Sequence, residues 1–320
     1  MAYFLGVDGG GSKTTCAVGD EISLLATVTT GPSNITRVGE ARARESLHQA
    51  MRGACAEAEI DPGQVLRACV GIAGGGREEV AHAVQRMVAD DLISAEIEVV
   101  GDMQIALEAA FGAGPGVIVI AGTGSIAFGR DAHEETARAG GWGFAISDEG
   151  SAHWIGRTAV STLLRAADRS AANQEAGDAA GLCRELKRAW KLRSFDELVL
   201  AANSSADFAA LFPAVLAAAD GEDALGQEVL ARAGRELACL AAMVSRRLFA
   251  ENNVSQSHIP LAMAGGVFGH SERVREAFCD EIRKLDSRFE VKPQIVEPVV
   301  GALLIARRTS PEDKTTRVRT

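Results

Sequence analysis

The chain has 320 residues, which is enough for about two domains and for a hydrophobic core that needs no disulfide or metal support. Hydrophobic residues make up 47% of it and charged residues 24%, a balance that excludes an intrinsically disordered chain. The 33 basic residues are outnumbered by 43 acidic ones, and a net charge of −10 excludes the broad basic surface of a general nucleic-acid-binding protein. A small anionic ligand needs only a local site and stays compatible with this charge.

The sequence predicts a cytoplasmic protein without a membrane partner. No run reaches the roughly 18 consecutive apolar residues that span a bilayer, and the amino-terminal residues lack the basic region of a signal peptide. The six cysteines form no C-x-x-C pair, which indicates reduced thiols rather than a zinc or redox site. They are Cys16, Cys55, Cys69, Cys183, Cys239 and Cys279.

In the first third of the chain, apolar runs and helical spacing predict alternating strands and helices. The expected strands are residues 3–7, 14–18, 24–29, 67–72 and 96–100. The expected helices are residues 39–59, 78–88 and 102–111. The last helix begins at Asp102, and an acidic residue is favourable at that end of a helix.

The rest of the chain repeats the opening pattern and then becomes helical. The all-apolar residues 117–120 suit a central strand buried on both faces, and a strand at 126–128 follows a second glycine-rich turn. Because strand, glycine turn and strand occur twice in this order, we expect an internal duplication of one fold unit. The remaining expected elements are helices within 151–249, strands at 259–264 and 289–296, helices at 271–285 and 298–308, and a frayed tail at 309–320.

The first glycine-rich segment follows the first strand and reads Gly6-Val7-Asp8-Gly9-Gly10-Gly11-Ser12-Lys13-Thr14. It matches neither the Walker loop nor the dinucleotide fingerprint, and a strand follows it instead of a helix. It therefore predicts a hairpin whose backbone amides bind phosphate, with Asp8 holding Mg²⁺ through water. The alternative is an ordinary glycine hairpin with a solvated aspartate.

The second glycine-rich segment is Ala121-Gly122-Thr123-Gly124-Ser125. It fits the letters of a dinucleotide fingerprint through Ala127, but no helix-length segment follows it. A second phosphate hairpin that adds the hydroxyls of Thr123 and Ser125 is the better interpretation, and a plain turn between strands is the alternative.

Asp102 is a candidate general base because it follows a strand in an α/β sheet, where reactive groups collect. Phosphoryl transfer to a hydroxyl needs one oriented carboxylate to accept the proton. The alternative is an N-cap of the following helix.

Two further segments suggest ligand contacts. Gly140-Gly141-Trp142-Gly143 offers an apolar plate with glycine backbone around it, and Asp148 and Glu149 follow, as a sugar pocket requires. The alternative is a glycine-hinged loop with a buried tryptophan and an N-capping acid. Gly265-Gly266 at a strand end leaves room for a flat ligand such as adenine, and a strand-to-helix turn is the simpler reading of that pair alone.

In this order the segments resemble the sugar kinase, chaperone and actin ATPase superfamily. They look closest to the N-acetylglucosamine kinase and BadF/BadG/BcrA/BcrD ATPase family, from Leu5 to about Ala306. The resemblance implies two ribonuclease-H-like (actin-like ATPase) α/β domains with ATP in the interdomain cleft. Domain I would comprise residues 1–113 and 298–320, and domain II residues 114–297.

The resemblance also implies a reaction, in which ATP phosphorylates the 6-hydroxyl of an amino sugar with Asp102 as base. The implied sugar contacts are Asn34, Ser125, Gly141, Trp142 and Asp148. The implied ATP contacts are Gly10, Gly11, Ser12, Lys13, Thr14, Gly122, Thr123, Gly124, Gly265 and Gly266, with Asp8 positioning Mg²⁺. A homodimer is the expectation for the family.

One position departs from the family pattern. N-acetylglucosamine kinases of this family can carry an asparagine after the Gly-Thr-Gly-Ser turn, where this chain has Ile126. This difference leaves N-acetylglucosamine, glucosamine and other hexoses open as substrates.

Two other functions compete with the sugar kinase. One is an ATPase that activates a 2-hydroxyacyl-CoA dehydratase or benzoyl-CoA reductase, which would hold an iron–sulfur cluster with cysteines at a dimer interface. The cysteines of this chain are too dispersed to suggest such a cluster. The other is a non-catalytic sugar sensor, against which Asp102 argues.

Overall fold

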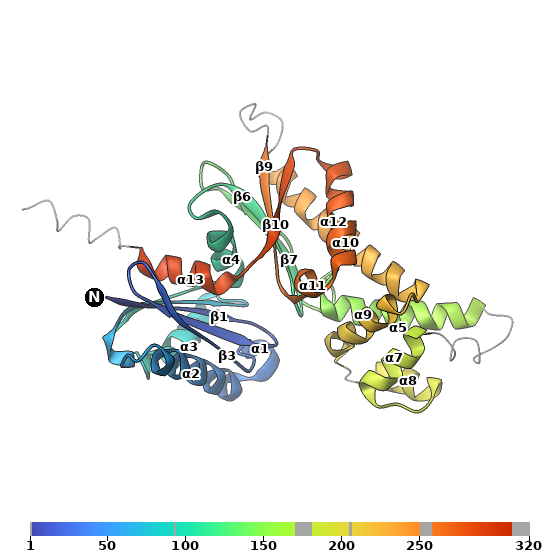
Figure 1. Ribbon diagram of the computed structural model, residues 1–320, viewed down its shortest axis with the longest axis horizontal. Coiled ribbons are helices and arrows are strands. Elements are labelled where there is room, and N and C mark those ends of the chain that lie inside the picture. The colour runs from blue at the N-terminus through green and yellow to red at the C-terminus, as the bar shows by residue number, and fades with distance from the viewer. Residues whose placement is uncertain (1, 93, 170–180, 205–206, 250–257, 309–320) are drawn as a thin grey trace, which may run out of the picture. The chain divides into compact units, whose positions relative to one another are not determined.

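The computed structural model describes residues 2–92, 94–169, 181–204, 207–249 and 258–308. The chain divides into two compact units (Figure 1). Unit 1 comprises Met1–Gly114 together with Val296–Thr320, and unit 2 comprises Pro115–Ile295. The predicted tail at residues 309–320 lies outside the described residues.

Unit 1 is built on a five-stranded mixed sheet in the order β3-β2-β1-β4-β5. Its first three strands form an antiparallel meander, and β4 and β5 run parallel to β1. The bounds are β1 Tyr3–Gly9, β2 Thr14–Gly19, β3 Leu24–Thr30, β4 Val65–Ile72 and β5 Glu96–Gly101. The central strands are buried on both faces, which explains their nearly continuous apolar sequence.

Helices cover both faces of this sheet. On one face α2 and α3 bury residues such as Leu47 and Val84 against Leu5 and Val7 of β1. On the other face, α4 and α13 pack against β1 residues that alternate with these, such as Phe4. Successive side chains of β1 point to opposite faces of the sheet, so they contribute to two separate hydrophobic cores. The helices of unit 1 are α1 Ile35–Val38, α2 Glu40–Glu57, η1 Pro62–Gln64, α3 Glu78–Ala89, α4 Asp102–Phe111 and α13 Pro298–Arg307.

Helix α13 brings the end of the chain back to its beginning. In Figure 1 it is the red helix that lies along the blue strands of unit 1. Its backbone comes so close to β1 that a Cβ on Gly6 would lie 2.4 Å from the Leu303 nitrogen. A Cβ on Gly301 would lie 1.9 Å from the carbonyl oxygen of Ile105 in α4, so both glycines are required by close backbone packing.

Unit 2 repeats the same sheet topology in the order β10-β9-β6-β7-β8. Strand β6 is central, antiparallel to β7 and parallel to β9. The bounds are β6 Gly116–Ala121, β7 Ser125–Arg130, β8 Thr136–Gly140, β9 Ile259–Ala264 and β10 Phe289–Val296. The sequence analysis missed β8, a short edge strand that contains only one strongly β-favouring residue, Thr136.

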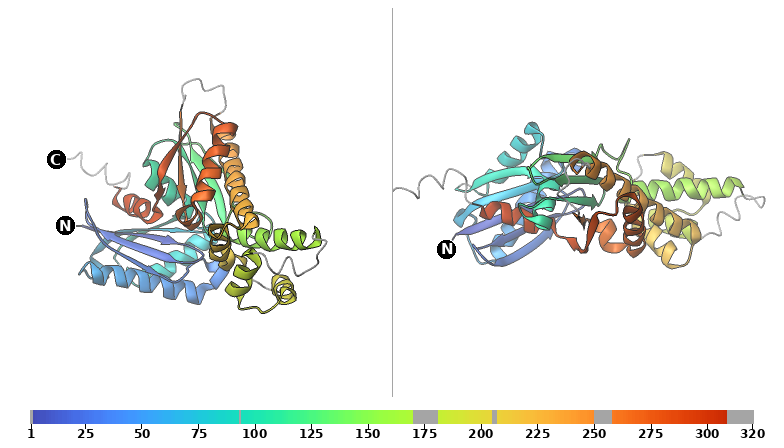
Figure 2. Two further views of the ribbon diagram at one scale, coloured as in Figure 1. Left: turned by 45° about the vertical axis from the view of Figure 1, so that its right-hand side comes forward. Right: turned by 90° about the horizontal axis from the view of Figure 1, so that it is seen from above.

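The helices of unit 2 form its main core against this sheet. The longest, α10, runs beside α12 (Figure 2), and a Cβ on Gly234 of α10 would lie 2.5 Å from the Val274 carbonyl oxygen. The bounds are α5 Ala152–Arg169, α7 Gly181–Trp190, α8 Phe195–Asn203, η2 Phe208–Leu211, α9 Phe212–Asp220, α10 Ala224–Leu248, α11 Gly266–His270 and α12 Glu272–Leu285. Among the described residues, no helix is long and apolar enough to cross a membrane.

Candidate active site

The carboxyl ends of three parallel strands in unit 1 bring two aspartates to one edge of the sheet. Asp8 lies near the end of β1 and Asp102 directly follows β5, with β4 between these strands. The β4 residue in register with Asp8 is Gly71, where a Cβ would lie 2.2 Å from Ile105 Cδ1. Because Gly71 has no side chain, β4 places nothing between Asp8 and the start of α4.

The charges of Asp102 and Glu297 both act on the ionisation of Asp8, and we call these three residues the acid cluster. The pKa of Asp8 is raised to about 7, mainly by burial and then by the Asp102 carboxylate; Lys13 lowers it, and Glu297 makes a smaller upward contribution. Burial also raises the pKa of Asp102, against a hydrogen bond that the Met103 amide donates to its Oδ1 at 3.0 Å. The raised pKa values of Asp8 and Asp102 mean that these two carboxyl groups ionise less readily than ordinary aspartates.

Asp102 is not the N-cap of α4, which was the alternative reading of this residue. Gly101 occupies the cap position, and its amide donates to Gln104 Oε1 at 2.8 Å. Asp102 thus lies in the first helical turn, where its Oδ1 accepts a hydrogen bond from the Met103 amide.

Within the acid cluster, Asp8 is the candidate ligand for a magnesium ion. Mg²⁺ is bound in proteins by one or two carboxylates and keeps water and phosphate oxygens as its other ligands. Within the described ranges, no three His, Cys, Asp or Glu side chains lie together as a complete metal site. Asp8 is the residue that would hold the ion, with the remaining ligands coming from water and a bound phosphate.

The first glycine hairpin, residues 9–14, is closed by a hydrogen bond from the Gly10 amide to the Lys13 carbonyl at 3.0 Å. Ser12 and Lys13 are exposed at its tip, whereas Thr14 is fully buried. The Thr14 hydroxyl donates to Ser33 Oγ at 2.8 Å. Thr14 therefore anchors the hairpin, and the cationic tip comes from Lys13.

Asn34 lies beside this hairpin with an unused acceptor. Its backbone amide and that of Ser33 donate to the Gly10 carbonyl at 3.2 and 3.1 Å. Asn34 is the N-cap residue of α1, yet its side chain makes no capping hydrogen bond, and its buried Oδ1 has no hydrogen-bond partner among the residues that the structure describes. A buried carboxamide oxygen without a donor costs free energy that a ligand hydroxyl would recover.

In unit 2, the second glycine hairpin, residues 121–125, is tied to Asp148. Amides of Ser125 and Gly143 donate to the Asp148 carboxylate, and burial raises the pKa of this group. A Cβ on Gly124 would lie 2.7 Å from Asp148 Oδ2. Asp148 itself has a φ of 64°, a left-handed conformation that is strained for a residue with a side chain. The structure thus holds this carboxylate beside the hairpin and does not use it to cap α5, where Ser151 Oγ accepts from the Trp154 amide.

The glycine-rich residues 141–147, which we call the tryptophan loop, present apolar side chains to solvent. Trp142 is 64% exposed, Phe144 59% and Ile146 80%, so the alternative of a buried tryptophan is wrong. Gly141 and Gly143 have φ values of 69° and 99°, which only glycine adopts readily. Gly141 lies against Ile126, since a Cβ there would be 2.8 Å from Ile126 Cδ1.

The Gly265–Gly266 pair serves two purposes. Gly265 has a φ of 95°, and a Cβ on it would lie 2.4 Å from the Ala121 carbonyl oxygen, so packing against β6 requires glycine there. A Cβ on Gly266 would lie 3.8 Å from His270 Cδ2 and within 4 Å of no other described residue apart from its neighbours. The pair is a strand-to-helix turn, and its second member leaves the backbone accessible to a ligand.

The sequence analysis missed several residues that shape these sites. Ser33 supports Thr14, Glu297 adds charge beside Asp8, and the His153 amide donates to the Thr123 carbonyl at 3.4 Å while its ring contacts Phe144. Glu297 directly precedes Pro298 at the start of α13. An acidic residue before a proline is a sequence signal for a helix start, and it could have drawn attention to Glu297. The positions of Ser33 and His153 depend on long-range contacts that have no local sequence signal.

Comparisons with known proteins now give these sites a context. The sequence profile of the BadF/BadG/BcrA/BcrD ATPase family matches residues 5–306. The chain is 30% identical over 316 residues to the N-acetylmuramic acid/N-acetylglucosamine kinase of Clostridium acetobutylicum, which covers 96% of this chain and 99% of the relative. It is 27% identical over 321 residues to the N-acetyl-D-glucosamine kinase of Dictyostelium discoideum, covering 95% of this chain and 97% of the relative.

The fold is shared with solved structures. A protein from Chromobacterium violaceum, solved as a proposed N-acetylglucosamine kinase, superposes with a TM-score of 0.71 at 24% identity, covering 96% of this chain and 99% of that one. This likeness confirms the predicted α/β fold of the actin-like ATPases. The family match and the full-length kinase relatives identify an ATP-using phosphotransferase with an alcohol group as acceptor. The chain belongs to the BadF/BadG/BcrA/BcrD ATPase family.

Proposed function

We propose that this protein is a sugar kinase that transfers the γ-phosphoryl group of ATP to the 6-hydroxyl of N-acetylglucosamine or glucosamine. The observation that carries the proposal is the carboxylate of Asp102. It follows a parallel strand, is not used as a helix cap, and has a pKa raised by burial. The names of the two curated relatives support an amino sugar as the acceptor.

Asp102 acts as the general base in this proposal. The 6-hydroxyl gives its proton to the Asp102 carboxylate as the oxygen forms a bond to the γ-phosphorus, and the bond from that phosphorus to the bridging oxygen of ADP breaks. A carboxylate with a raised pKa is a stronger proton acceptor than an ordinary aspartate. Such a base contributes about 10²- to 10⁴-fold to the rate, and electrostatic positioning of the phosphates contributes much of the rest.

The phosphates are assigned to the two glycine hairpins. Lys13 and the amides of residues 10–12 would neutralise and orient the phosphate oxygens, and Gly122, Thr123 and Gly124 would do the same from unit 2. Thr14 keeps the first hairpin in shape through Ser33. Asp8 would hold Mg²⁺, which supplies positive charge to the transferred phosphoryl group.

The sugar is assigned to Asn34, Ser125, Gly141, Trp142 and Asp148. The unpartnered Asn34 Oδ1 and the Asp148 carboxylate are acceptors suited to sugar hydroxyls, and Trp142 offers an apolar plate for the ring. We assign Ser125 to the edge of this group; its hydroxyl donates to the Glu149 carbonyl at 2.7 Å. Gly265 and Gly266 are assigned to the adenosine.

The proposal divides the work between a domain of residues 1–113 plus 298–320 and a domain of residues 114–297. The first supplies the base, Asp8 and one hairpin, and the second supplies the other hairpin and the tryptophan plate. The family resemblance also supports a homodimer that acts in the cytoplasm.

The competing function, an ATPase that activates a dehydratase or reductase, requires accessible cysteine thiolates. Cys16, Cys55, Cys69 and Cys183 are buried within the two units. Burial raises the pKa of the Cys55 thiol to about 11 and also raises the pKa of the Cys16 thiol, which opposes thiolate formation. These cysteines therefore favour the kinase.

A substrate screen tests the proposal. The purified protein with Mg-ATP is offered N-acetylglucosamine, glucosamine, glucose and N-acetylmannosamine, ADP release is followed, and the product is analysed by phosphorus and carbon NMR. We expect ADP to form in proportion to an amino sugar 6-phosphate. Sugar-independent ADP release together with bound iron would overturn the proposal in favour of the activator.

A further inference from the structure

The second residue of α5, His153, contacts two parts of unit 2 that the proposed function assigns to ligands. Its backbone amide donates to the Thr123 carbonyl of the second glycine hairpin at 3.4 Å, beside a shorter bond from the Ala152 amide to the Gly122 carbonyl at 2.9 Å. Its imidazole contacts the Phe144 ring of the tryptophan loop, with 4.9 Å between the ring centroids. The main chain of this helical turn therefore holds the hairpin, whereas the side chain of His153 contacts the loop.

The core of unit 2 supports the imidazole of His153. Phe208 of η2 packs edge-on against it with 5.4 Å between centroids, and Trp190 of α7 packs against Phe208 at 5.5 Å. Both of these aromatic side chains are partly buried against the main core of the unit. Gly156 lies one turn after His153, and a Cβ on it would lie 2.0 Å from the Phe208 carbonyl oxygen. This close backbone contact between α5 and η2 fixes the ring of Phe208 beside the imidazole.

The tryptophan loop needs support of this kind because most of its own side chains face solvent. Phe144 is 59% exposed and Ile146 80% exposed. Glycines in the loop enlarge the number of conformations that it loses when it is ordered. A contact that fixes the loop therefore raises the fraction of molecules whose loop is ready to bind a ligand, and the apparent affinity rises with that fraction.

We propose that His153 is a positioning residue that holds the tryptophan loop in its sugar-binding conformation through the ring of Phe144. This inference rests on the proposed function, because it assigns a role at the same site. The side chain of His153 then acts on the sugar, whereas its backbone amide, which every substitution except proline retains, acts on the phosphate hairpin. Removing the imidazole should therefore weaken sugar binding and leave ATP binding in place.

The first test separates the two substrates. KM values for Mg-ATP and for the amino sugar with the highest rate are measured by ADP release in wild type, His153→Ala and His153→Phe. We expect His153→Ala to raise the KM for the sugar by about 3- to 10-fold, since one aromatic contact changes an equilibrium constant by about 2- to 12-fold. The KM for Mg-ATP should stay within about 2-fold of wild type. His153→Phe keeps a flat ring between the same neighbours and should restore most of the sugar affinity.

The second test asks whether His153 acts through Phe144. Phe144→Ala removes the other ring of the contact, and its exposure means that the fold should tolerate the change. We expect a similar rise in the KM for the sugar. When Phe144 is already alanine, His153→Ala should add little, because residues that act through one shared contact are not additive.

Hydrogen exchange followed by mass spectrometry reads the loop without any activity. In the protein without ligands, residues 141–147 should exchange faster in His153→Ala and in Phe144→Ala than in wild type, and His153→Phe should restore slow exchange. Leu200 of α8 provides the matched control, since it is an apolar side chain of unit 2 that is 71% exposed. Leu200→Ala should change neither the exchange of the loop nor either KM.

The outcomes separate this inference from the proposed function. If His153→Ala raises the KM for both substrates equally, or leaves the exchange of residues 141–147 unchanged, the inference is wrong and the kinase assignment stands. If His153→Ala has its full effect in the Phe144→Ala background, His153 does not act through the loop and the inference is again wrong. Should His153→Ala not fold, Phe144→Ala with His153→Phe still decides the matter by loop exchange and sugar KM. If wild type phosphorylates no amino sugar, the proposed function itself fails.

Discussion

Ionisation of Asp8 costs free energy in the folded protein because the group is enclosed and shares its surroundings with two other carboxylates. Its pKa of about 7, against an ordinary value of 3.8, places its titration near neutrality. Such a perturbed group beside a second acid is typical of a functional site rather than of a core built for stability. In the proposed kinase, Mg²⁺ and the phosphates of ATP would offset this cost.

The pKa of Asp8 predicts how stability depends on pH. Between pH 4 and pH 7 the unfolded chain has lost this proton and the folded chain has kept it, so stability falls as pH rises through this window. The loss amounts to at most about 4 kcal/mol above pH 7. Asp8→Asn removes the titration, and in EDTA the variant should melt at a higher temperature than wild type at pH 8 and at a similar temperature at pH 4.

Although the Asp8→Asn variant should be more stable than wild type at pH 8, it should be less active. Asp8→Asn should lower Mg-ATP-dependent turnover, because Asp8 is the proposed ligand of the ion. Thermal melts of both proteins across pH 4–8.5 are the measurement. Parallel pH profiles would show that Asp8 does not titrate as its surroundings indicate.

Asp102→Asn tests the base directly. The amide cannot accept the proton of the sugar hydroxyl, so kcat should fall by about 10²- to 10⁴-fold. The affinity for a non-hydrolysable ATP analogue, measured by calorimetry, should stay near that of wild type. Turnover at the wild-type rate would remove Asp102 from the mechanism.

At the scale of elements, the second glycine hairpin depends on Gly124, because there is no room for a side chain at this position. Gly124→Ala places a methyl group 2.7 Å from Asp148 Oδ2, so either the hairpin or the buried carboxylate must move. We expect a lower melting temperature and a higher KM for the sugar. Gly122→Ala is the control for stability, since among the described residues, apart from its chain neighbours, no atom lies within 4 Å of its added Cβ. Equal melting temperatures of the two variants would contradict the packing described for this hairpin.

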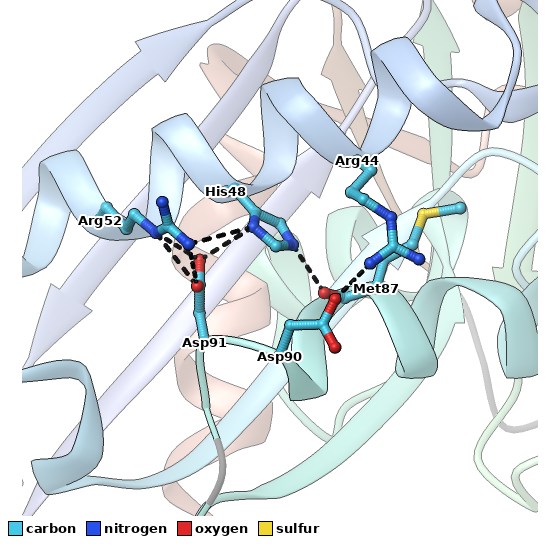
Figure 3. Close-up of polar contacts among 6 residues, drawn as sticks. All are labelled: Arg44, His48, Arg52, Met87, Asp90 and Asp91. Carbon is cyan, nitrogen blue, oxygen red and sulfur yellow. Dashed lines mark hydrogen bonds and ion pairs between the residues drawn. The ribbon is translucent and has the colours of Figure 1, made fainter.

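Polar contacts join helix α2 to the carboxyl-terminal end of helix α3 and to the two residues that follow it, Asp90 and Asp91 (Figure 3). Arg52 Nε donates to both oxygens of Asp91, at 3.1 and 3.0 Å, and His48 Nδ1 lies 3.3 Å from Asp91 Oδ2. The other ring nitrogen of His48 bonds the Met87 carbonyl at 2.8 Å. A second pair, Arg44 with Asp90, is more exposed.

This difference predicts unequal effects of two neighbouring substitutions. The Asp91 side chain is 7% exposed and that of Asp90 is 55% exposed. Asp91→Ala should therefore lower the melting temperature clearly, because it leaves His48 and Arg52 without their shared acceptor. Asp90→Ala removes an exposed ion pair and should change little. Thermal melts of the two variants at pH 7 make the comparison, and a larger effect of Asp90→Ala would refute it.

For the molecule as a whole, the return of α13 completes unit 1. Val299, Ala302 and Leu303 cover one face of its sheet, and Glu297 at the start of the same helix belongs to the acid cluster. The fold of unit 1 and the charge of the acid cluster therefore both depend on α13.

A chain that ends after Glu297 should lose the fold of unit 1, because one apolar sheet face and the backbone contact at Gly6 are left uncovered. A chain that ends after Arg308 keeps α13 and should remain folded. Hydrogen exchange followed by mass spectrometry reads the two units separately. Continued protection of β1 and β4 in the shorter chain would show that α13 is dispensable.

The features that the sequence alone determined are those that depend on neighbouring residues. The apolar runs and glycine turns predicted the repeated strand–hairpin–strand order, and Asp102 was placed at the end of a strand, because periodicity and turn residues act over a few neighbours. Only the tertiary structure decided that Glu297 would add its charge beside Asp8, that Asn34 would keep a buried oxygen without a donor, and that Arg138 would lie on Trp142. Each of these depends on residues from different elements meeting in space, where burial and charge depend on contacts that local sequence patterns do not specify.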